Sequence, residues 1–485
     1  MNHQHDSTWY WRSLDFDALT RDFPPPPDYF DKVFRISRDE LRGRQNTRFL
    51  ATVDRGWAIP FFQRHWGSVG LERGDIRGLD DLTKLPPYTV RELRESIERN
   101  PPFGDFMGIS PTDGARMPLV LQTSGGTTGL PRPMLYAPQD REAMAILGAR
   151  RFALQGVRPG DMVMVTYSLG LGNGAIAPRE ALWRYTGAVP VMTGSGATTP
   201  TRRQIEIAKA WGVNVILGFP SYLRHLAIVA KEELGIDPHS LGIRSLGSHL
   251  GQEDRVQMEE LWNAPCFDAY GTHESGMMAA ECDARAGMHI QEDAVILEVA
   301  DPETGAVLPE GEKGSVYITT LYRWGAPQIR FNINDISRII PEPCPCGGTL
   351  RRLDRIFGRN DTMVKLRGVN VFPEAIGGIV ARRRRFLRWP RERLSRGHRR
   401  NRRLRASQQR RVFLHRRARR RRAARRDDGV GRGGATIRRT RAIAGGSGAS
   451  FQGSTRRAPH RPGRRARQHR RVHGHFQNVQ DQALA

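Results

Sequence analysis

The pattern of hydrophobic positions in residues 1–376 alternates between two kinds of segment. Short apolar runs have the length of strands and lie at 118–121, 134–137, 161–167, 213–219, 243–249 and 266–270. Stretches between them have helical spacing, and one such face carries Leu223, Leu226, Ala227, Ala230 and Leu234. Strands that alternate with helices of this length predict an α/β fold with a mainly parallel sheet flanked by helices.

The pattern differs on either side of this alternating region. Residues 1–110 are helical and irregular in pattern, whereas residues 294–320 change to strand-like alternation around the turn sequence Asp301-Pro-Glu-Thr-Gly305. We therefore predict a smaller β subdomain after the α/β core. No run of 18 apolar residues occurs, and the first residues lack the features of a signal peptide. Together with only four cysteines, this predicts reduced thiols, no membrane contact and a cytoplasmic location.

The net charge of +27 arises from one end of the chain. Residues 377–485 contain 35 arginines, no lysine and 4 acidic residues, which gives a net charge of +31. Residues 1–376 keep 42 of the 77 basic and 46 of the 50 acidic residues, which gives a net charge of −4. Two different compositions therefore share one chain, and the larger part is an ordinary, mildly acidic globular protein.

A loop rich in glycine and hydroxyl residues joins the first two predicted strands. It reads Gln122-Thr-Ser-Gly-Gly-Thr-Thr-Gly-Leu-Pro131. Glycine lets the backbone approach closely, so that successive N–H groups can point at one anion. A P-loop would need Gly-Lys-Ser/Thr before a helix, and Leu130-Pro131 stands there instead. The sequence predicts a phosphate-binding loop of another kind, and a surface hairpin is the alternative.

The loop and the motifs that follow it resemble those of the adenylate-forming enzymes, the acyl-CoA synthetase superfamily. The resemblance is strongest to the phenylacetate–coenzyme A ligase branch, and it covers roughly residues 50–376. The motifs after the loop are Asp268-Ala-Tyr-Gly-Thr-His-Glu274, Ile329-Arg-Phe-Asn-Ile-Asn-Asp335, Gly358-Arg-Asn-Asp361 and Arg367-Gly-Val-Asn-Val-Phe-Pro373. They stand in the order that the family uses.

The resemblance implies an adenylating domain followed by a hinge and a lid. The expected parts are an N-terminal helical part at 1–110, an α/β ATP-binding core at 111–290 and a β subdomain at 291–357. The hinge and the start of the lid would lie at 358–376, with the hinge at Asp361. The arginine-rich residues 377–485 then stand in the place of the lid.

The resemblance also implies a chemistry. A carboxylate attacks the α-phosphorus of ATP, pyrophosphate leaves, and the acyl group passes from the acyl adenylate to coenzyme A. Glu274 would bind Mg²⁺, a cation that prefers oxygen ligands. Asp335 and Arg359 would hold the ribose, and Tyr270 would lie against the adenine. The full set of implied catalytic and nucleotide-binding residues is Thr123, Ser124, Gly125, Gly126, Thr127, Thr128, Gly129, Asp268, Tyr270, Gly271, His273, Glu274, Asp335 and Arg359.

The chain departs from the family in the residues implied for adenine and acyl binding. His273 stands where a hydroxyl residue is usual. The implied acyl pocket contains Tyr167, Leu169, Asn173, Gly247 and Ser248, and Leu169 and Asn173 occupy positions where aromatic rings are expected. The resemblance therefore implies a carboxylic acid substrate, with an aryl or arylacetic acid as the leading guess.

A glycine-rich stretch at 170–175 also fits the dinucleotide fingerprint G-x-G-x-x-G/A. That fingerprint needs an acidic residue about 20 positions further on to hold the ribose. Residues 188–196 contain no carboxylate, so the sequence argues against a dehydrogenase.

Three cysteines and one histidine offer a candidate metal site. Six residues separate Cys282 from His289, and Cys344-Pro-Cys346 follows more than 50 residues later. Three thiolates and an imidazole would complete a closed, tetrahedral zinc site of the structural kind. Some members of the branch carry a similar set of residues, and buried reduced cysteines are the alternative.

The arginine-rich end has two interpretations. A basic run such as 416–426 is typical of a segment that binds nucleic acid without sequence preference. However, selection for positive charge would be expected to use some lysine, and Lys365 is the last lysine in the chain. Out-of-frame translation of a GC-rich gene produces many arginine codons. We therefore favour a frameshift that replaces the lid, which in the family supplies a lysine to the reaction.

The sequence thus predicts an AMP-forming acid–thiol ligase whose ligation step is impaired by the loss of its lid. Its partners would be a small carboxylic acid, ATP and coenzyme A, with no membrane partner. Delivery of the acyl group to a carrier protein is one alternative, and a non-catalytic protein with a nucleic-acid-binding end is another. The sequence does not fix the oligomeric state, and a homodimer stays open.

Overall fold

The computed structural model describes residues 10–124, 131–251, 255–360, 364–366 and 369–371. All of them belong to one compact unit that spans residues 1–388. The expectations for the arginine-rich end and for the hinge at Asp361 lie outside the described residues. No described helix has the length and apolar character needed to span a membrane.

The N-terminal part is helical, as the sequence predicts, and its longest helix, α3, has 19 residues. Its α-helices are α1 (Phe16–Asp22), α2 (Asp28–Lys32), α3 (Arg38–Gly56), α4 (Pro60–Gly67) and α5 (Val90–Arg99). Its 3-10 helices are η1 (Tyr10–Ser13), η2 (Leu79–Lys84) and η3 (Pro111–Ala115). Side chains fix where these helices begin: Ser37 accepts a hydrogen bond from the Glu40 N–H at the start of α3, and Thr89 forms a capping box with Glu92 at the start of α5.

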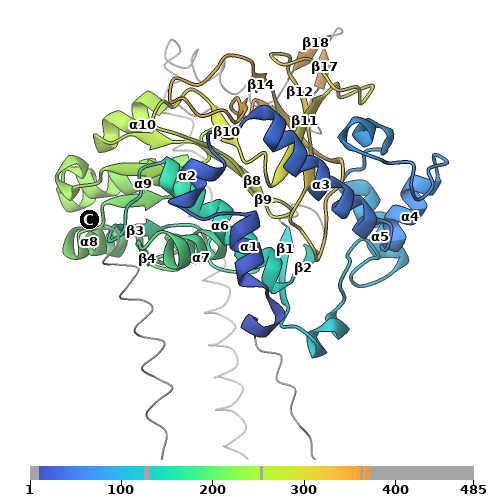
Figure 1. The fold of residues 1–485 in the computed structure, drawn as a ribbon. Coiled ribbons are helices and arrows are strands. Elements are labelled where there is room, and N and C mark those ends of the chain that lie inside the picture. The colour runs from blue at the N-terminus through green and yellow to red at the C-terminus, as the bar shows by residue number, and fades with distance from the viewer. Residues whose placement is uncertain (1–9, 125–130, 252–254, 361–363, 367–368, 372–485) are drawn as a thin grey trace, which may run out of the picture. The chain divides into compact units, whose positions relative to one another are not determined.

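A five-stranded parallel sheet forms the α/β core (Figure 1). Its strand order is β4 (Val189–Val191), β3 (Met162–Val165), β5 (Val215–Leu217), β6 (Ser245–Gly247) and β7 (Cys266–Phe267). The connecting helices are α6 (Pro138–Leu154), α7 (Ile176–Tyr185), α8 (Thr201–Trp211), α9 (Pro220–Ile228), the π-helical turn η4 (Val229–Glu233), the 3-10 helix η5 (Pro238–Leu241) and α10 (Arg255–Trp262).

Both faces of this sheet are buried, because successive strand residues point to opposite sides. On β3, Val163 and Val165 pack in one cluster with Phe152 of α6 and Leu182 of α7. Met164 belongs to a second cluster that contains residues of α8, α9 and α10. The prediction of an α/β fold with a parallel sheet between helices is therefore confirmed.

Antiparallel pairing is more extensive than the sequence indicates. One five-stranded sheet has the order β14 (Ile339–Ile340), β15 (Arg352–Leu353), β10 (Met288–Ile290), β9 (Gly276–Glu281) and β8 (Ala269–Thr272). A four-stranded sheet has the order β11 (Val295–Ala300), β12 (Gly314–Thr320), β13 (Phe331–Ser337) and β16 (Gly358–Arg359). Antiparallel structure thus begins at β8, about 20 residues before the position predicted for the β subdomain.

Two hairpins complete the strands. The first joins β1 (Val120–Ser124) to β2 (Arg132–Tyr136), and the second joins β17 (Val364–Leu366) to β18 (Val369–Val371). The turn predicted at 301–305 follows β11. There the Asp301 carboxylate accepts hydrogen bonds from the N–H groups of Glu303 and Thr304, and Gly305 has a φ of +71°.

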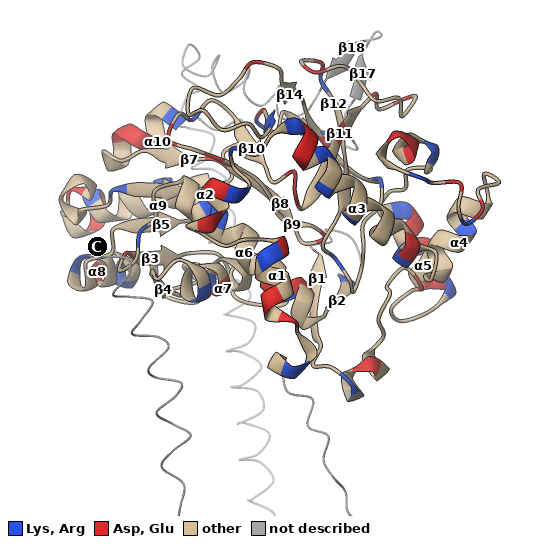
Figure 2. Cartoon of the chain, in the orientation of Figure 1, with Lys and Arg blue, Asp and Glu red and all other residues tan. Residues whose placement is uncertain are grey.

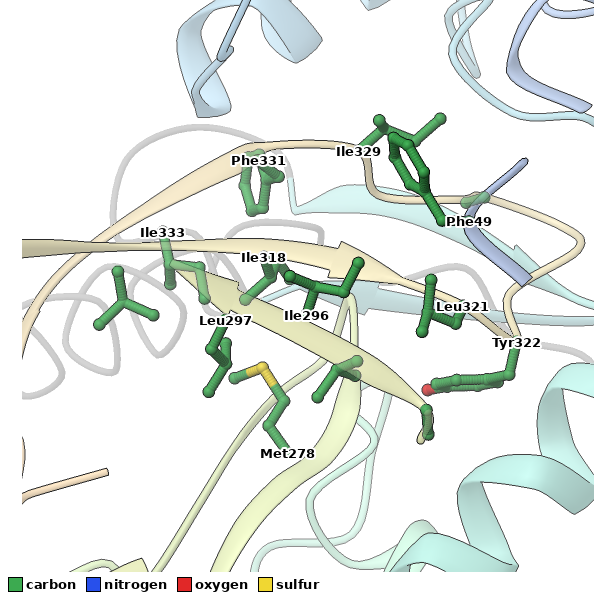
Figure 3. Packing of buried hydrophobic residues seen from close by; sticks show 14 of the residues in the cluster. Phe49, Met278, Ile296, Leu297, Ile318, Leu321, Tyr322, Ile329, Phe331 and Ile333 are labelled. Atoms are coloured by element: carbon green, nitrogen blue, oxygen red, sulfur yellow. The ribbon is translucent and has the colours of Figure 1, made fainter. Parts of the chain in front are cut away.

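The largest core lies between the four-stranded sheet and the N-terminal helices. Figure 3 shows Phe49 of α3 beside the side chains of β11, β12 and β13. The labelled members are Met278, Ile296, Leu297, Ile318, Leu321, Tyr322, Ile329, Phe331 and Ile333. Charged side chains instead gather on the outer helices, while the strands are largely free of them (Figure 2). This packing fixes β13 and β16, which carry residues of the site described next.

Candidate active site

The hairpin of β1 and β2 brings Thr123, Ser124 and Pro131, which flank the glycine-rich loop, to one edge of a polar cavity. Thr123 and Ser124 end β1, and Ser124 is paired in register with Arg132 of β2. The Thr123 N–H donates to the Leu171 carbonyl at 2.9 Å, so that the hairpin is tied to the segment after β3. The loop between the strands, with Gly125, Gly126, Thr127, Thr128 and Gly129, lies outside the described residues.

This cavity has a volume of about 1030 Å³ and is open to solvent. We call it the polar cavity because Arg132, Glu274, Asp335 and Arg359 line it, although apolar atoms form the larger part of its surface. Strand ends that are distant in the sequence meet around it. The residues that line it and were predicted for the nucleotide site are Thr123, Ser124, Gly271, His273, Glu274, Asp335 and Arg359. The structure therefore gathers all of the described nucleotide-site residues at one cavity except Asp268 and Tyr270, which lie against a second cavity.

Glu274 forms a buried ion pair with Arg132. Both side chains are less than one tenth exposed, and the Arg132 guanidinium also lies 5.9 Å from the centre of the Phe331 ring. A carboxylate removed from water needs such a partner, because an uncompensated buried charge is costly. In the free protein the predicted Mg²⁺ ligand is thus held in place by a cation of the chain itself.

Asp335 stands at the centre of a second polar group. The Arg359 guanidinium donates to Asp335 Oδ1 at 3.1 Å across the β13–β16 pair. The Tyr270 hydroxyl donates to Asp335 Oδ2 at 2.7 Å. Burial and the neighbouring Asp335 carboxylate raise the pKa of Tyr270 well above its ordinary value, so the hydroxyl stays a donor. The residues predicted for ribose and adenine thus form one connected group.

The turn between β8 and β9 separates the polar cavity from an apolar one. Gly271, Thr272 and His273 line both cavities, and we call these three residues the junction turn. A Cβ atom at Gly271 would lie 2.4 Å from the Gly276 carbonyl oxygen, so only glycine fits there. The Tyr136 hydroxyl donates to the His273 carbonyl at 2.7 Å and fixes the turn from the other side.

The apolar cavity has a volume of about 450 Å³ and is lined largely by apolar atoms. Tyr167 and Asn173, both predicted for the acyl pocket, line it. Leu169 is 48 % exposed and is not among its lining residues. Gly247 and Ser248 lie behind its wall: the Ser248 hydroxyl donates to the Gly218 carbonyl, and Gly247 packs close to Leu217 and Arg151.

Asp268 is buried at the wall of the apolar cavity. Its Oδ1 accepts hydrogen bonds from the N–H groups of Leu250 and Ala269, each at 2.8 Å. Burial nevertheless raises the pKa of Asp268 to about 6, with these hydrogen bonds opposing the rise. In the free protein the carboxylate therefore orders the backbone around the cavity.

Several residues of the two cavities were not identified from the sequence. Arg132, Arg151, Phe219 and His249 line them, and none belongs to a recognised motif. For Arg132 a signal exists, since it is the first charged residue after the glycine-rich loop. For Phe219 and His249 the signal is their position at the carboxyl ends of predicted strands of a parallel sheet, where binding sites gather. Arg151 lies within a helix and gives no such signal.

The predicted metal ligands come together at the far side of the antiparallel sheet. The ligand atoms of Cys282, His289, Cys344 and Cys346 all lie within 4.8 Å of one another. The Sγ atoms of Cys282 and Cys344 are 3.8 Å apart, and Cys346 Sγ is 3.3 Å from His289 Nε2. His289 Nδ1 lies 3.2 Å from the Leu350 carbonyl, which fits an Nδ1–H tautomer with Nε2 free to ligate.

A parallel sheet with helices on both faces, an antiparallel region and two cavities that meet at one turn define an adenylate-forming fold. The family model described as AMP-binding enzyme matches residues 81–321. Phenylacetate-coenzyme A ligases of Aromatoleum evansii and Thermus thermophilus are each 32% identical to this chain. The match with the Aromatoleum evansii enzyme covers 74% of this chain and 79% of that enzyme. The match with the Thermus thermophilus enzyme covers 73% of this chain and 78% of that enzyme.

Solved structures agree with the sequence relatives. A 2-hydroxyisobutyryl-CoA ligase in complex with 2-HIB-AMP and CoA has a TM-score of 0.66 and 27% identity, over 78% of this chain and 80% of that one. Its open conformation gives a TM-score of 0.67 at 26% identity, over 79% and 83%. The chain therefore belongs to the AMP-binding enzyme family. The prediction of an AMP-forming acid–coenzyme A ligase, which uses ATP and coenzyme A, is confirmed at this level.

Proposed function

We propose that this enzyme activates an aryl or arylacetic acid at the junction turn. The single observation that supports this is the arrangement of the two cavities, which share Gly271, Thr272 and His273. Adenylation needs a carboxylate at the end of an acyl pocket to meet the α-phosphate of ATP. An apolar cavity of about 450 Å³ that opens beside a polar one of about 1030 Å³ provides for both partners.

The chain's own residues would offset the charge of the reactants. Carboxylate and triphosphate repel each other, so catalysis depends on cationic groups fixed before the reaction. Arg132 lines the polar cavity next to the strand end that leads into the glycine-rich loop. When bound at Glu274, Mg²⁺ would supply Lewis-acid stabilisation of the phosphate oxygens. Binding a cation there requires Glu274 to share its carboxylate between the cation and Arg132.

Asp335, Arg359 and Tyr270 would orient the nucleoside. A carboxylate can accept hydrogen bonds from two vicinal hydroxyl groups, and the Arg359 guanidinium, which donates to Asp335 Oδ1, orients the carboxylate for that purpose. The Tyr270 hydroxyl already donates a hydrogen bond to Asp335 Oδ2 in the free protein. The group is therefore ordered before ATP arrives, which lowers the entropic cost of binding.

The identity of the acid is supported by the relatives and by the shape of the cavity. The relatives that match most of this chain are phenylacetate-coenzyme A ligases, and Tyr167 and Phe219 line the cavity with their rings 5.0 Å apart. An aromatic acid would pack against such a pair edge-to-face. The solved relative acts on a smaller acid, 2-hydroxyisobutyrate, so the family tolerates differences in size.

The cluster of Cys282, His289, Cys344 and Cys346 would hold a structural Zn²⁺. Sulfur atoms about 2.3 Å from a tetrahedral zinc lie roughly 3.8 Å apart, and Cys282 and Cys344 are separated by 3.8 Å. The Phe34 ring packs on His289 at 4.9 Å between ring centres, so the site would also join the N-terminal segment to the sheet. None of the four residues lines either cavity, which favours a role in folding over one in catalysis.

The arginine-rich end bears on the second half of the reaction. In the family the lid supplies a lysine, and no lysine follows Lys365 in this chain. We propose that residues 377–485 are the product of a frameshift near 380–385 and that ligation by this 485-residue chain is impaired. Resequencing this codon region decides between a frameshift and a genuine end. Normal turnover by the 485-residue protein with a confirmed reading frame would overturn the proposal.

The experiment that tests the proposed function is ATP–pyrophosphate exchange with a panel of carboxylic acids. We expect exchange that depends on aryl or arylacetic acids and on Mg²⁺, with aliphatic acids of similar size weaker. Adding coenzyme A or a purified carrier protein then identifies the acyl acceptor. Nucleotide binding without exchange for any acid in a chain with a restored lid would contradict the proposal.

A further inference from the structure

Arg151 is a buried cation without an ion-pair partner among the residues that the structure describes. Of the other six buried arginines in the described part of the chain, five lie within 4 Å of a carboxylate, and Arg352 donates to two backbone carbonyls. The five ion pairs are Arg132–Glu274, Arg141–Glu180, Arg150–Asp293, Arg323–Asp140 and Arg330–Glu298. Arg151 is 1 % exposed and makes one side-chain hydrogen bond, from Nε to Gln155 Oε1 at 3.3 Å.

The guanidinium of Arg151 belongs to the wall of the apolar cavity. Its Nη2 and the Tyr167 hydroxyl are both buried, and neither has a well-aligned hydrogen-bond partner within the described residues. The two side chains are neighbours and interact with each other, so that Arg151 opposes the rise that burial causes in the pKa of Tyr167. A Cβ at Gly247 would lie 3.2 Å from Arg151 Nη2, so glycine at this position leaves room for the guanidinium.

The surroundings compensate this charge only in part: the guanidinium lies 5.2 Å from the centre of the Phe152 ring, and it interacts with the neighbouring Tyr167 hydroxyl. The Asp268 carboxylate acts on Arg151 electrostatically, but it lies beyond ion-pair distance and its Oδ1 is held by two backbone N–H groups. His249, which also lines this cavity, is kept neutral, because burial and Arg151 lower its pKa to about 4. A buried, uncompensated charge costs several kcal/mol. Leucine or methionine would fill the same space without that cost.

We propose that Arg151 selects acids whose end distal to the reacting carboxyl group carries a second carboxylate. The proposal rests on the proposed function, since it assigns the substrate class of the same acyl cavity. The reacting carboxyl group lies at the junction turn, and the distal carboxylate accepts hydrogen bonds from Arg151 and from the Tyr167 hydroxyl. An aryl acid with a carboxylate in the para position fits both the apolar walls and the single cation.

The experiment compares three phenylacetic acids that differ only at the para position. Phenylacetate carries hydrogen, 4-nitrophenylacetate carries a neutral group of the same shape as a carboxylate, and 4-carboxyphenylacetate carries the proposed anion. Their kcat/KM in pyrophosphate exchange, and their affinities by calorimetry in the presence of a non-hydrolysable ATP analogue, are measured. We expect the carboxylate to be favoured over the nitro compound by about 10- to 100-fold, the range for a charged hydrogen bond.

Two variants test the role of Arg151. Arg151→Met keeps the volume and removes the charge, so we expect it to abolish the preference for the distal carboxylate and to favour phenylacetate. Arg151→Lys keeps the charge and should retain part of the preference. Thermal unfolding gives a readout that needs no substrate: Arg151→Met should keep or raise the Tm, whereas the matched variant Arg150→Met, which leaves Asp293 unpaired, should lower it by several degrees.

The outcomes separate this inference from the proposed function. Exchange with phenylacetate but no advantage for the distal carboxylate would overturn the inference and leave the proposed function standing. Binding of 4-carboxyphenylacetate that depends on Arg151, with no exchange for any acid, would support the inference and contradict the proposed function. A marked loss of Tm in Arg151→Met with no change in acid preference would make Arg151 a structural residue and overturn the inference.

Discussion

Two groups of buried polar side chains in this enzyme are completed in different ways. At the polar cavity, Arg132 pairs with Glu274, and Asp335 binds both Arg359 and Tyr270, so the chain supplies both members of each interaction. In the cluster of Cys282, His289, Cys344 and Cys346, four ligand atoms face one another instead. The first group keeps its geometry without a ligand, whereas the second is the one that we propose a cation completes.

Electrostatics sharpens this contrast. Burial raises the pKa of Cys282 to about 12 and lowers that of His289 to about 4, so both groups are neutral in the free protein at pH 7. A zinc ion would reverse the first shift, because a coordinated thiol is deprotonated outright. Metal binding therefore releases protons at this cluster, while nothing comparable is required at the polar cavity.

The largest effect is expected from breaking the cysteine and histidine cluster. Cys344→Ser should remove one equivalent of zinc and lower the free energy of unfolding by roughly 4–5 kcal/mol or more, because a closed metal site contributes its binding energy to folding. Metal content by mass spectrometry and chemical denaturation measure both quantities. Cys266→Ser is the matched control, since Cys266 is buried outside the cluster. Equal metal content in both variants, or none in wild-type protein prepared without chelators, would contradict the prediction.

The second-largest effect is expected from replacing Glu274, whose carboxylate forms an ion pair with Arg132. We expect Glu274→Gln to slow acyl-adenylate formation by about 10²- to 10³-fold, because the variant loses the proposed Mg²⁺ ligand where phosphate charge develops. Stability should also fall, by about 3 kcal/mol, because Arg132 stays buried without a counter-charge. Pyrophosphate exchange and urea denaturation measure the two effects.

Glu98→Gln is the matched control for Glu274. Glu98 lines the same polar cavity but is exposed and has no buried partner among the described residues. Its neutralisation should change the exchange rate by less than about threefold, the range of a weak surface interaction. Wild-type exchange in Glu274→Gln, or an equal loss in both variants, would remove Glu274 from the site.

Much of the fold could be predicted from the sequence, because hydrophobic spacing carries the parallel sheet. The strands β3, β5 and β6 each lie inside a predicted apolar run, although the runs extend one or two residues beyond each end of the strand. The edge strand β4 was missed, since three residues with Pro190 in the middle give no alternating pattern. The extent of antiparallel pairing from β8 onward was missed as well, because strands buried on both faces lose the period of two.

In the site as well, residues that belong to a sequence motif could be predicted, whereas residues that matter only through their surroundings in space could not. Motifs identified Glu274, Asp335 and Arg359, since their neighbours in the sequence define them. Arg151 could not be found in this way, because its significance depends on the absence of a carboxylate around it in space. Gly247 was predicted as a contact of the substrate, whereas in the structure it makes room for the Arg151 side chain.

A third prediction tests the connected group at Asp335. Asp335→Asn should weaken nucleotide binding roughly 30- to 100-fold, because an amide cannot accept from two hydroxyls and from Arg359 as a carboxylate does. Calorimetric titration with an ATP analogue measures the loss. Tyr270→Phe removes only the hydroxyl that donates to Asp335 at 2.7 Å, and it should weaken binding less. A larger loss in Tyr270→Phe than in Asp335→Asn would place the nucleoside elsewhere.

The smallest effect is expected at Asp268, which stands between the two kinds of buried group. Backbone N–H groups hold its carboxylate, but no counter-ion lies within ion-pair distance in the described residues. Burial raises its pKa from the ordinary 3.8 to about 6, so folding favours the protonated form. The associated stability is fully present below pH 4 and is lost as the pH rises through 6.

We therefore expect the wild type to lose about 2 kcal/mol of unfolding free energy between pH 4 and pH 7 relative to Asp268→Asn. The asparagine side chain can still accept from the Leu250 and Ala269 N–H groups, so the variant keeps the local hydrogen bonds. Urea denaturation of both proteins at several pH values gives the difference, in which the other titrating groups cancel. If the difference in unfolding free energy between the two proteins did not change between pH 4 and pH 7, Asp268 would be solvated or paired with Arg151. Pairing with Arg151 would also contradict the proposal that this guanidinium is free to bind a second carboxylate of the substrate.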